Sequence, residues 1–397
     1  MKIVQINSFS NGSTGKIMMS IHKELLKQGH ESYVVWGRGR KAENEHEIFM
    51  NDKIGVYFHA LYSRLTGKTG FASKRATKKL IKKIEEINPD VIHLHNIHGY
   101  YINIEMLFNY LKKIKAKKVW TLHDCWAFTG QCPHFTYVKC DKWKSHCEKC
   151  PMINEYPKTL VDNSKLNFER KKELFTGVDN LTIVTPSDWL AGLVKESFLK
   201  EYNVEVIHNG INTNIFKPTE SDFRKKYNLE DKKIILGVAS VWTKKKGLYD
   251  FIELSKLLDD NYVIVLVGVN KKQLKQLPKN IIGIQRTENQ IELAGLYSTS
   301  DLFFNPTYED NYPSVNIEAI ACGTKILAYN NGGNSEFSQF LNNRGSFIIK
   351  ENDSNIFNES LSVEIESFIN DSNKKISIDS KNVDLIEFCN KYFKVYI

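Results

Sequence analysis

Residues 307–333, TYEDNYPSVNIEAIACGTKILAYNNGG, constrain the fold more than any other part of the chain. The apolar run at 302–304 just before them is typical of a buried strand. Helix signals begin at Ser314, the expected N-cap, and Gly323 stands where a helix C-terminus favours glycine. A second strand at 325–329 then runs into a glycine pair. The order strand, acidic loop, helix, strand predicts an α/β unit.

The predicted helix start is suited to bind a phosphate. The backbone N–H groups of Ser314, Val315 and Asn316 are expected to lack helical partners, and they lie at the positive end of the helix dipole. Glu318 falls about one turn further on, where a carboxylate can accept hydrogen bonds from ribose hydroxyls. The alternative is that Glu318 is a solvated helix carboxylate and the preceding loop is a surface turn.

Asp310 and Glu318 are two acidic residues separated by seven others, and small residues and a glycine follow them. This stretch resembles the nucleotide-sugar site of retaining GT-B glycosyltransferases of family 4. The form EDNYPSVNIEAIACG is most similar to the capsule and exopolysaccharide, or colanic-acid-type, branch. The resemblance implies that Glu318 holds the ribose of the donor. It also implies that Asp310, or its neighbour Glu309, contacts the donor sugar.

The resemblance extends over nearly the whole chain and implies an α/β protein with the GT-B fold, in which two Rossmann-like domains face a central cleft. The length of 397 residues suits two domains. We expect an acceptor-side domain at 1–205 with a Cys-rich insertion at 132–150. A nucleotide-sugar-binding domain is expected at 206–380. A C-terminal helix, within 381–397, would then cross back to the first domain.

Two loops are expected to hold the donor diphosphate. The first follows the strand at 2–6 and contains Gly12 and Gly15, which let the backbone approach a ligand closely. The resemblance places Gly15, and less directly Gly12, at the donor phosphates. In the second loop, SVWTKKKG, Lys246 fits the family lysine that binds the diphosphate. The family arginine has no match there, and Lys244 or Lys245 would have to replace it.

Acceptor-site candidates follow two buried strands of the first domain. His95, Asn96 and His98 come after the strand 90–95, at the sheet edge where open α/β sheets bind ligands. The alternative is that these side chains only satisfy local hydrogen bonds. The resemblance places His123 beside the reacting sugar, with Asp124 orienting its ring. It implies front-side attack, in which the leaving phosphate and not His123 takes the acceptor proton.

Four of the seven cysteines lie within a short polar and aromatic stretch: Cys132, Cys140, Cys147 and Cys150. Four thiolates that include a CxxC pair suit a tetrahedral structural zinc. Such a zinc would be structural, because four protein ligands leave no open position for catalysis. Free thiols and disulfides remain the alternatives, although a cytosolic chain disfavours disulfides.

The formal net charge of +9 is carried by clusters that include the basic residues of 74–83 and 112–118. Solvated faces are one interpretation, and attraction to an anionic membrane or a diphosphate-bearing acceptor is the other. Nucleic acid is not an expected partner, because no recognition-helix or aromatic-interleaved basic motif is found. The polar N-terminus and the lack of a long apolar run predict a cytoplasmic protein, with peripheral contact to the inner face of the membrane as a further hypothesis.

These observations predict a retaining hexosyltransferase that moves a sugar from a nucleotide diphosphate donor, UDP-sugar by default, to a glycan or lipid-linked acceptor. No catalytic divalent metal is expected, since no DxD motif stands in a suitable loop. One alternative is a nucleotide-sugar epimerase or phosphorylase on the same fold. Another is a catalytically degenerate interaction protein with a zinc-ribbon loop, which the missing arginine favours.

Overall fold

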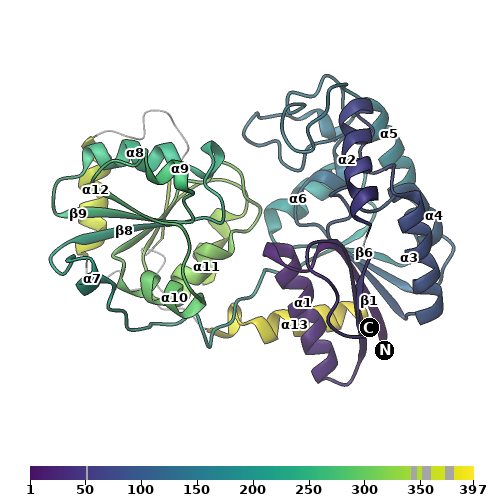
Figure 1. The fold of residues 1–397 in the computed structure, drawn as a ribbon, viewed down its shortest axis with the longest axis horizontal. Coiled ribbons are helices and arrows are strands. Elements are labelled where there is room, and N and C mark those ends of the chain that lie inside the picture. The colour runs from purple at the N-terminus through teal and green to yellow at the C-terminus, as the bar shows by residue number, and fades with distance from the viewer. Residues whose placement is uncertain (51, 341–346, 351–358, 372–379) are drawn as a thin grey trace. The chain divides into compact units, whose positions relative to one another are not determined.

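The structure is a computed structural model that describes residues 1–397 except 51, 341–346, 351–358 and 372–379 (Figure 1). Contacts divide the chain into two compact units. The first contains Met1–His208 together with Phe388–Ile397, and the second contains Asn209–Glu387. The domain limits expected at 205 and 380 stay predictions beside this division.

The described residues of the first unit form a seven-stranded, all-parallel sheet in the order β3-β2-β1-β4-β5-β6-β7. Its strands are β1 (Lys2–Phe9), β2 (Glu31–Arg38), β3 (Glu47–Phe49), β4 (Val91–Leu94), β5 (Lys117–Thr121), β6 (Leu181–Thr185) and β7 (Asn203–Val206). Its helices are α1 (Gly12–Lys27), α2 (Lys53–Thr66), α3 (Lys74–Ile87), α4 (Ile104–Leu111), α5 (Ser164–Phe175), α6 (Asp188–Glu196) and α13 (Leu385–Tyr396). The strand order reverses between β1 and β4, and this is where a doubly wound sheet binds ligands.

The pattern of apolar residues in the sequence explains which side chains of this unit are buried. All four residues of β4 are buried, as expected for a parallel strand covered on both faces. Helix α3 turns Leu80, Ile84 and Ile87 to the core and its lysines to solvent, the division of a surface helix. Lys118 departs from the basic cluster expected at 112–118. Its side chain is buried, and its ammonium donates to the carbonyls of Ile114 and Asp179 at 2.6 and 3.2 Å.

The C-terminal helix α13 packs within the first unit, and its contributing residues begin at Phe388. The Tyr396 hydroxyl lies 2.7 Å from Nδ1 of His93, on β4. The Tyr392 hydroxyl lies 3.0 Å from Oγ1 of Thr121, which is itself 2.8 Å from Nε2 of His93. Two tyrosines of the last helix thus close a buried polar network at the centre of the sheet.

The described residues of the second unit form a six-stranded parallel sheet in the order β10-β9-β8-β11-β12-β13. Its strands are β8 (Lys233–Val238), β9 (Tyr262–Val267), β10 (Ile281–Ile284), β11 (Leu302–Asn305), β12 (Ile326–Tyr329) and β13 (Phe347–Lys350). Its helices are α7 (Phe223–Lys226), α8 (Leu248–Leu257), α9 (Lys271–Leu274), α10 (Gln290–Thr299), α11 (Ser314–Ala321) and α12 (Glu359–Asn370). The order reverses between β8 and β11, so the two units share one topology.

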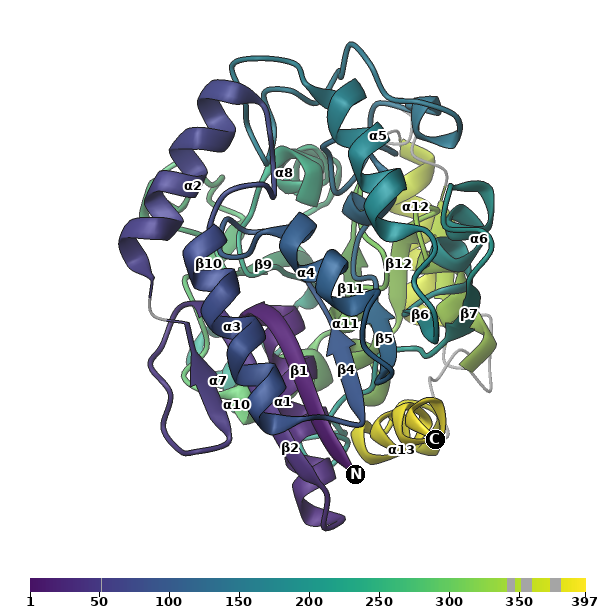
Figure 2. The same ribbon diagram turned by 90° about the vertical axis from the view of Figure 1, so that its right-hand side faces the viewer.

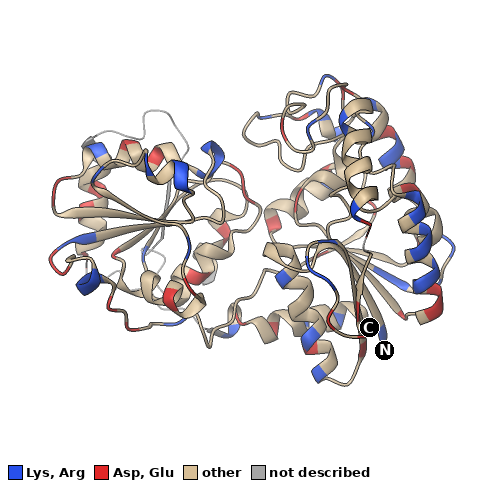
Figure 3. Ribbon diagram, viewed as in Figure 1, with Lys and Arg blue, Asp and Glu red and all other residues tan. Residues whose placement is uncertain are grey.

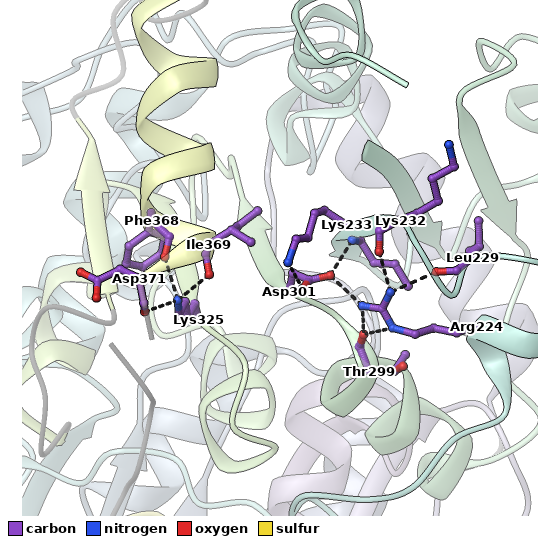
Figure 4. A network of polar contacts seen from close by, with 11 residues as sticks. Arg224, Leu229, Lys232, Lys233, Thr299, Asp301, Lys325, Phe368, Ile369 and Asp371 are labelled. Carbon is purple, nitrogen blue, oxygen red and sulfur yellow. Dashed lines mark hydrogen bonds and ion pairs between the residues drawn. The ribbon is translucent and has the colours of Figure 1, made fainter. Parts of the chain in front are cut away.

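Two basic side chains tie helix ends to this second sheet (Figure 4). Arg224 donates to the carbonyls of Leu229, Lys232 and Thr299, and it pairs with Asp301 at 2.7 Å. Lys325 donates to the carbonyls of residues 368, 369 and 371 at the end of α12, at 2.7 to 2.9 Å. A cation at these carbonyls also complements the negative end of the helix dipole.

Candidate active site

The site in the second unit lies at the carboxyl ends of β8 and β11, the two strands between which the sheet order reverses. A single 3₁₀ turn, Lys244–Lys246, follows β8. The acidic loop that begins at Thr307 follows β11. The Tyr308 N–H donates to the Lys245 carbonyl at 2.8 Å, so the two loops are joined through their backbones.

Two ion pairs join these loops side chain to side chain. The Lys245 ammonium lies 2.8 Å from Glu309, and the Lys246 ammonium lies 2.6 Å from Asp310. The Glu309 side chain is only 4% exposed, whereas that of Asp310 is 24% exposed. The Lys245–Glu309 pair is therefore the inner one, and Lys246 and Asp310 are the pair that a ligand can reach.

Glycines make the close approach of the loops possible. Gly247 has φ +76°, and a Cβ there would lie 2.4 Å from Cγ of Pro306. Gly332 has φ +57°, and a Cβ there would lie 1.8 Å from the Asp310 carbonyl oxygen. Any larger residue at Gly332 would push the acidic loop away. Gly332, the first glycine of the pair that ends the sequence motif, thus allows the chain after β12 to pass close to the Asp310 carbonyl.

The start of α11 corrects the expected cap. The N-cap is Pro313, with φ −69° and ψ +113°, and Ser314 is the first helical residue. The proline ring fixes φ of the residue just before the helix, and no side chain caps this helix start. The Asn316 N–H is also used, because it donates to the Pro313 carbonyl at 3.1 Å. Ser314 and Val315, both half-buried, remain the backbone candidates for an anion.

A chain of buried asparagines holds this helix start in place, and the sequence alone did not indicate it. Asn305, the last residue of β11, donates to Asn316 at 2.8 Å. Asn316 in turn donates to Asn334 at 2.9 Å, and Asn334 donates to the Tyr329 carbonyl at 3.1 Å. The three residues stand at a strand end, a helix start and the turn after the glycine pair. In the sequence, the one sign of this chain of hydrogen bonds was that asparagine recurs at a strand end, a helix start and a turn.

Glu318 is half-buried in α11, and its Oε2 accepts a hydrogen bond from the Tyr297 hydroxyl at 3.1 Å. Tyr297 lies on α10 and is fully buried. Burial, and then the neighbouring Glu318 charge, raise the pKa of the Tyr297 hydroxyl well above its usual value. Tyr297 therefore stays a hydrogen-bond donor that orients the carboxylate, a role that the sequence did not reveal.

In the first unit, His95 follows β4 and His123 follows β5, next to the point where that sheet reverses order. Nδ1 of His95 lies 3.0 Å from Nε2 of His123, and the two rings stack at 12°. Nε2 of His95 lies 3.3 Å from the side-chain Oε1 of Gln5, on β1. Burial lowers the pKa of His123 to about 4, so its imidazole is neutral at neutral pH. Such a ring can exchange hydrogen bonds with a sugar hydroxyl without carrying a charge.

Asp124 also meets a second histidine, His98, which the sequence did not suggest. Its Oδ2 lies 2.9 Å from Nε2 of His98, and its Oδ1 accepts from the Trp126 N–H at 2.8 Å. Loop 96–101 brings His98 to this carboxylate, an approach that no sequence pattern predicts. Burial disfavours the charged carboxylate of Asp124, but His98, His134 and the Trp126 N–H together outweigh burial and lower the pKa of Asp124 to about 2. Nδ1 of His98 lies 3.1 Å from the Tyr156 hydroxyl.

These groups border a pocket of the first unit. Its lining includes His98, Tyr100, Trp126 and Tyr156. Aromatic rings with a few polar groups are typical of the lining of small-molecule sites. Asn96, the other acceptor candidate, is half-buried; its N–H donates to Asn7 at 3.1 Å.

The glycine loop after β1 is closely packed. Gly12 has φ +72°, and a Cβ at Gly15 would lie 2.6 Å from the Ser10 carbonyl carbon. Gly15 is buried in the first turns of α1. Packing of the loop on itself therefore requires a glycine at position 15, whether or not a phosphate approaches it.

The four clustered thiols line one pocket of the first unit, together with Gly130 and Trp143 among others. The Gly130 N–H donates to Cys147 at 3.3 Å, and hydrogen bonding from the Cys132 thiol lowers the pKa of Cys150 to about 7. All four cysteines are free. In the described part of the chain, no three of the sulfurs lie within 4.8 Å of one another. Residue type and shared pocket fit a zinc, while the sulfur spacing is wider than that of a closed tetrahedral site.

Comparison with known proteins agrees with this architecture. Two doubly wound parallel sheets of one topology define the class of GT-B proteins. HepE of Anabaena, solved in complex with UDP-glucose, superposes with a TM-score of 0.65 over 99% of this chain and 98% of that chain, at 14% identity. A likeness at this identity establishes the fold. The predicted fold class is thereby confirmed.

Family models match both units. The model of Glycosyltransferase Family 4 matches residues 14–215, half of the chain, and that of Glycosyl transferases group 1 matches residues 219–382. The chain belongs to glycosyltransferase family 4, which confirms the predicted family.

Curated relatives match only about half of the chain. WcaC of Escherichia coli K12, assigned to colanic acid biosynthesis as a glycosyl transferase, is 29% identical over 226 residues, 53% of this chain and 55% of that protein. The processive diacylglycerol alpha-glucosyltransferase of Acholeplasma laidlawii is 26% identical over 215 residues, 49% of this chain and 64% of that protein. The chain thus spans only about half to two thirds of the length of these relatives.

Proposed function

We propose that this chain transfers a sugar from a nucleoside diphosphate sugar to a glycan or lipid-linked acceptor. The observation that carries the proposal is the pairing of Lys246 with Asp310 at the reversal point of the second sheet. A cation for a diphosphate and a carboxylate for sugar hydroxyls stand together there, eight residues before Glu318. A UDP-sugar is the preferred donor, and the UDP-glucose bound by HepE supports this choice.

The roles follow from chemistry and exposure. Glu318, held by Tyr297, accepts hydrogen bonds from the ribose hydroxyls. Lys246 and the N–H groups of Ser314 and Val315 bind the diphosphate and stabilise the charge that grows on the leaving group. Asp310 contacts the donor sugar. Glu309, 4% exposed, is better suited to hold Lys245 than to reach a ligand.

The lysine turn also bears on the missing arginine. Lys245 is committed to Glu309, whereas Lys244 is exposed at the start of the turn. Lys244 is therefore our candidate for the second cation at the diphosphate. With Lys246, it would neutralise the leaving group without a catalytic metal. Gly15 stays the predicted contact of the first unit to the donor phosphates.

The reaction is proposed to retain the anomeric configuration by front-side attack. The neutral ring of His123 would then position a hydroxyl and leave the proton to the departing phosphate. His98, held by Asp124, would line the acceptor pocket. A lipid-linked acceptor is supported by the A. laidlawii relative, whose name gives a diacylglycerol substrate. The exposed lysines of α3 support contact with an anionic membrane.

A structural zinc at Cys132, Cys140, Cys147 and Cys150 belongs to the same proposal. The four thiols share one pocket, and a backbone N–H already donates to Cys147. Lys171 lies buried beside them: its side-chain nitrogen donates to the carbonyls of Trp126 and Thr129 at 2.7 and 3.1 Å, and burial lowers its pKa to about 7. Elemental analysis of purified protein should find about one zinc per chain, and a Cys147→Ser, Cys150→Ser variant should lose it. A metal-free wild type with four titratable thiols would reject the zinc.

The reaction itself is tested by incubating the protein with UDP-, GDP-, ADP- and CMP-sugars and a bacterial lipid extract. We expect release of one nucleotide and a lipid-linked product whose anomeric proton has the donor's configuration by NMR. An inverted product would reject retention. Donor binding without any turnover across acceptors would favour the degenerate interaction protein, which the missing arginine keeps as the second candidate.

A further inference from the structure

Helix α2 (Lys53–Thr66) exposes its apolar side and buries its polar side. The exposed apolar residues are Ile54, Tyr57, Phe58, Leu61 and Leu65, which are 84, 78, 64, 54 and 53% exposed. We call these five residues the α2 apolar face. The buried residues of the same helix include His59 and Ser63. This is the reverse of the pattern of an ordinary surface helix.

The spacing places these residues in one continuous stripe. With 3.6 residues per turn, the α2 apolar face covers an arc of roughly 100°, and His59 and Ser63 lie on the opposite side. Figure 2 shows α2 along the outer edge of the first unit, and Figure 1 shows it on the viewer's side of that unit. A stripe of five large side chains on one helix exceeds the scattered apolar residues of an ordinary surface.

The inward side of α2 anchors the helix to the unit through His59 and Ser63 and through Val56, which packs against the core. Nδ1 of His59 lies 2.8 Å from the Ser73 hydroxyl, and the His59 ring meets the Tyr100 ring edge-on at 5.8 Å. The N-cap Asp52 accepts from the Gly55 N–H at 2.9 Å, and Gly67 ends the helix with φ +68°. The helix is therefore held in this orientation by caps and buried contacts, and the apolar face takes no part in holding it.

The exposed apolar surface continues past the end of α2. The Leu160 N–H donates to the Arg64 carbonyl at 2.8 Å, which brings Leu160 and Val161 beside the last turn. These two side chains are 62 and 46% exposed. Two segments far apart in the sequence thus contribute to one apolar surface.

Positive charge borders this surface. Lys53 and Arg64, the two charged residues of α2, are exposed and fall on the same side of the stripe, about a quarter turn from its centre. Helix α3, whose N-cap Ser73 contacts His59 of α2, carries six further cations, all exposed: Lys74, Arg75, Lys78, Lys79, Lys82 and Lys83. Figure 3 shows α2 almost free of charge and α3 rich in basic residues. A second copy of the chain would bring the same positive charge to the contact, whereas an anionic lipid surface would complement it.

We propose that the α2 apolar face inserts into the interfacial region of an anionic lipid bilayer, with Lys53 and Arg64 at the level of the headgroups. An amphipathic helix that lies in the membrane plane has this combination of an apolar stripe and flanking cations. The helix rests on Tyr100, which also lines the His98 pocket. Insertion would therefore bring that pocket to the lipid surface. Lipid binding by α2 needs no sugar transfer. Only the link between the membrane and the acceptor pocket rests on the proposed function.

The test is co-sedimentation of the full chain with vesicles of phosphatidylcholine alone or mixed with phosphatidylglycerol, without donor. Wild type should bind the anionic vesicles, and Phe58→Ser combined with Leu61→Ser should lower the vesicle affinity at least about tenfold. Ile291→Ser is the matched control, because Ile291 is 61% exposed on α10 and lies in the other unit. That control should bind like wild type. Equal binding by the double variant and wild type would overturn the proposal.

Two further measurements distinguish lipid insertion from self-association. Phe58→Trp should show quenching of the new tryptophan by brominated lipid tails, whereas Tyr249→Trp, on α8, should not. A double variant that instead converts an oligomer into a monomer, with no vesicle binding by wild type, would assign the face to a second copy and overturn the lipid proposal. Glu318→Ala should weaken donor binding roughly 30-fold and keep vesicle binding. The Phe58, Leu61 double variant should bind UDP like wild type, so failure of the lipid proposal is distinguishable from failure of the proposed function.

Discussion

The Lys246 ammonium lies 2.6 Å from the Asp310 carboxylate, in the part of the second unit where the donor diphosphate and sugar are proposed to bind. Without a donor, the two side chains bind each other. When a donor enters, Lys246 is expected to bind the diphosphate and Asp310 the sugar. The pair keeps Lys246 oriented before binding, and it also competes with the diphosphate for the same ammonium. Substitution of Lys246 should therefore affect binding of the diphosphate, whereas substitution of Asp310 should affect the donor sugar.

Asp310→Asn should strengthen the binding of UDP itself while it lowers sugar transfer. Removing the carboxylate frees Lys246 for the diphosphate, and a partly exposed pair is worth up to about 1 kcal/mol, so the Kd for UDP should fall by up to about fivefold. Sugar transfer should fall because the donor sugar loses its carboxylate. Calorimetric titration with UDP and a turnover assay measure the two effects. Weaker UDP binding in Asp310→Asn would show that Asp310 supports the diphosphate site instead of competing with it.

Glu309→Gln should destabilise the second unit. The Glu309 side chain is 4% exposed, and the change replaces the carboxylate that pairs with the Lys245 ammonium, 25% exposed, by a neutral amide. Loss of one member of a buried pair costs about 3–5 kcal/mol, and partial exposure of Lys245 reduces the expected loss to about 2 kcal/mol. Denaturant unfolding measures it. Glu253→Gln is the matched control, because the Glu253–Lys256 pair is exposed and should contribute almost nothing. Equal unfolding curves for both variants would contradict a structural role of Glu309.

Tyr297→Phe should weaken donor binding through Glu318. The variant removes one hydroxyl that donates to the Glu318 carboxylate at 3.1 Å and leaves the ring in place. A hydrogen bond to a charged group contributes about 1.5 kcal/mol, so KM for the donor should rise roughly tenfold at nearly unchanged kcat. Steady-state kinetics with varied donor separates the two constants. A fall in kcat with constant KM would show that Tyr297 does not act through ribose binding.

Acid should destabilise the first unit through its buried histidines. Burial lowers the pKa of His59 to about 4, below its ordinary value of 6.5, so the unfolded chain binds the extra proton between these values. The stability is present above pH 6.5 and is lost as the pH falls toward 4. Going from about pH 7.5 to about pH 5 should cost about 2 kcal/mol from His59 alone.

His59→Gln isolates this contribution, because glutamine keeps a hydrogen bond to Ser73 and does not titrate. Its unfolding free energy should fall less over the same pH range than that of wild type, as followed by denaturant unfolding with far-UV circular dichroism. An equal fall in both proteins would place the acid sensitivity elsewhere, for example at His22, whose pKa burial also lowers to about 4.

Sequence patterns predicted the sheet strands well where an apolar run is bounded by polar residues. Strands were expected at 302–304 and 325–329, and the structure has β11 at Leu302–Asn305 and β12 at Ile326–Tyr329. Helix α2 was not predicted. The reason is physical: its apolar residues face outward and its buried side is polar, so the rule that assigns apolar faces to the core misleads. The three-residue strand β3 is too short to produce a periodic signal.

The candidate site was predictable in its residue types and less so in its pairings. The spacing of Asp310 and Glu318 and the lysine before Gly247 mark the site in the sequence alone. Which lysine meets which carboxylate depends on two loops that are adjacent only in the folded sheet. For the same reason the sequence did not indicate that Asp124 meets His98. The Asn316 N–H was expected to be unpaired and available to a ligand, whereas in the structure it donates to the Pro313 carbonyl.

Donor binding at Glu318 tests the central claim most directly. A thermal-shift screen of wild type, Glu318→Ala and the exposed-site control Glu253→Ala should be run against UDP-, GDP-, ADP- and CMP-sugars. We expect one class of nucleotide sugar to stabilise wild type and Glu253→Ala, because a ligand that binds only the folded chain raises its melting temperature. Glu318→Ala should lose most of that shift, as about 2 kcal/mol of ribose hydrogen bonds corresponds to a roughly 30-fold weaker Kd. An equal shift in Glu318→Ala, or no shift with any nucleotide sugar, would contradict the assignment of this site.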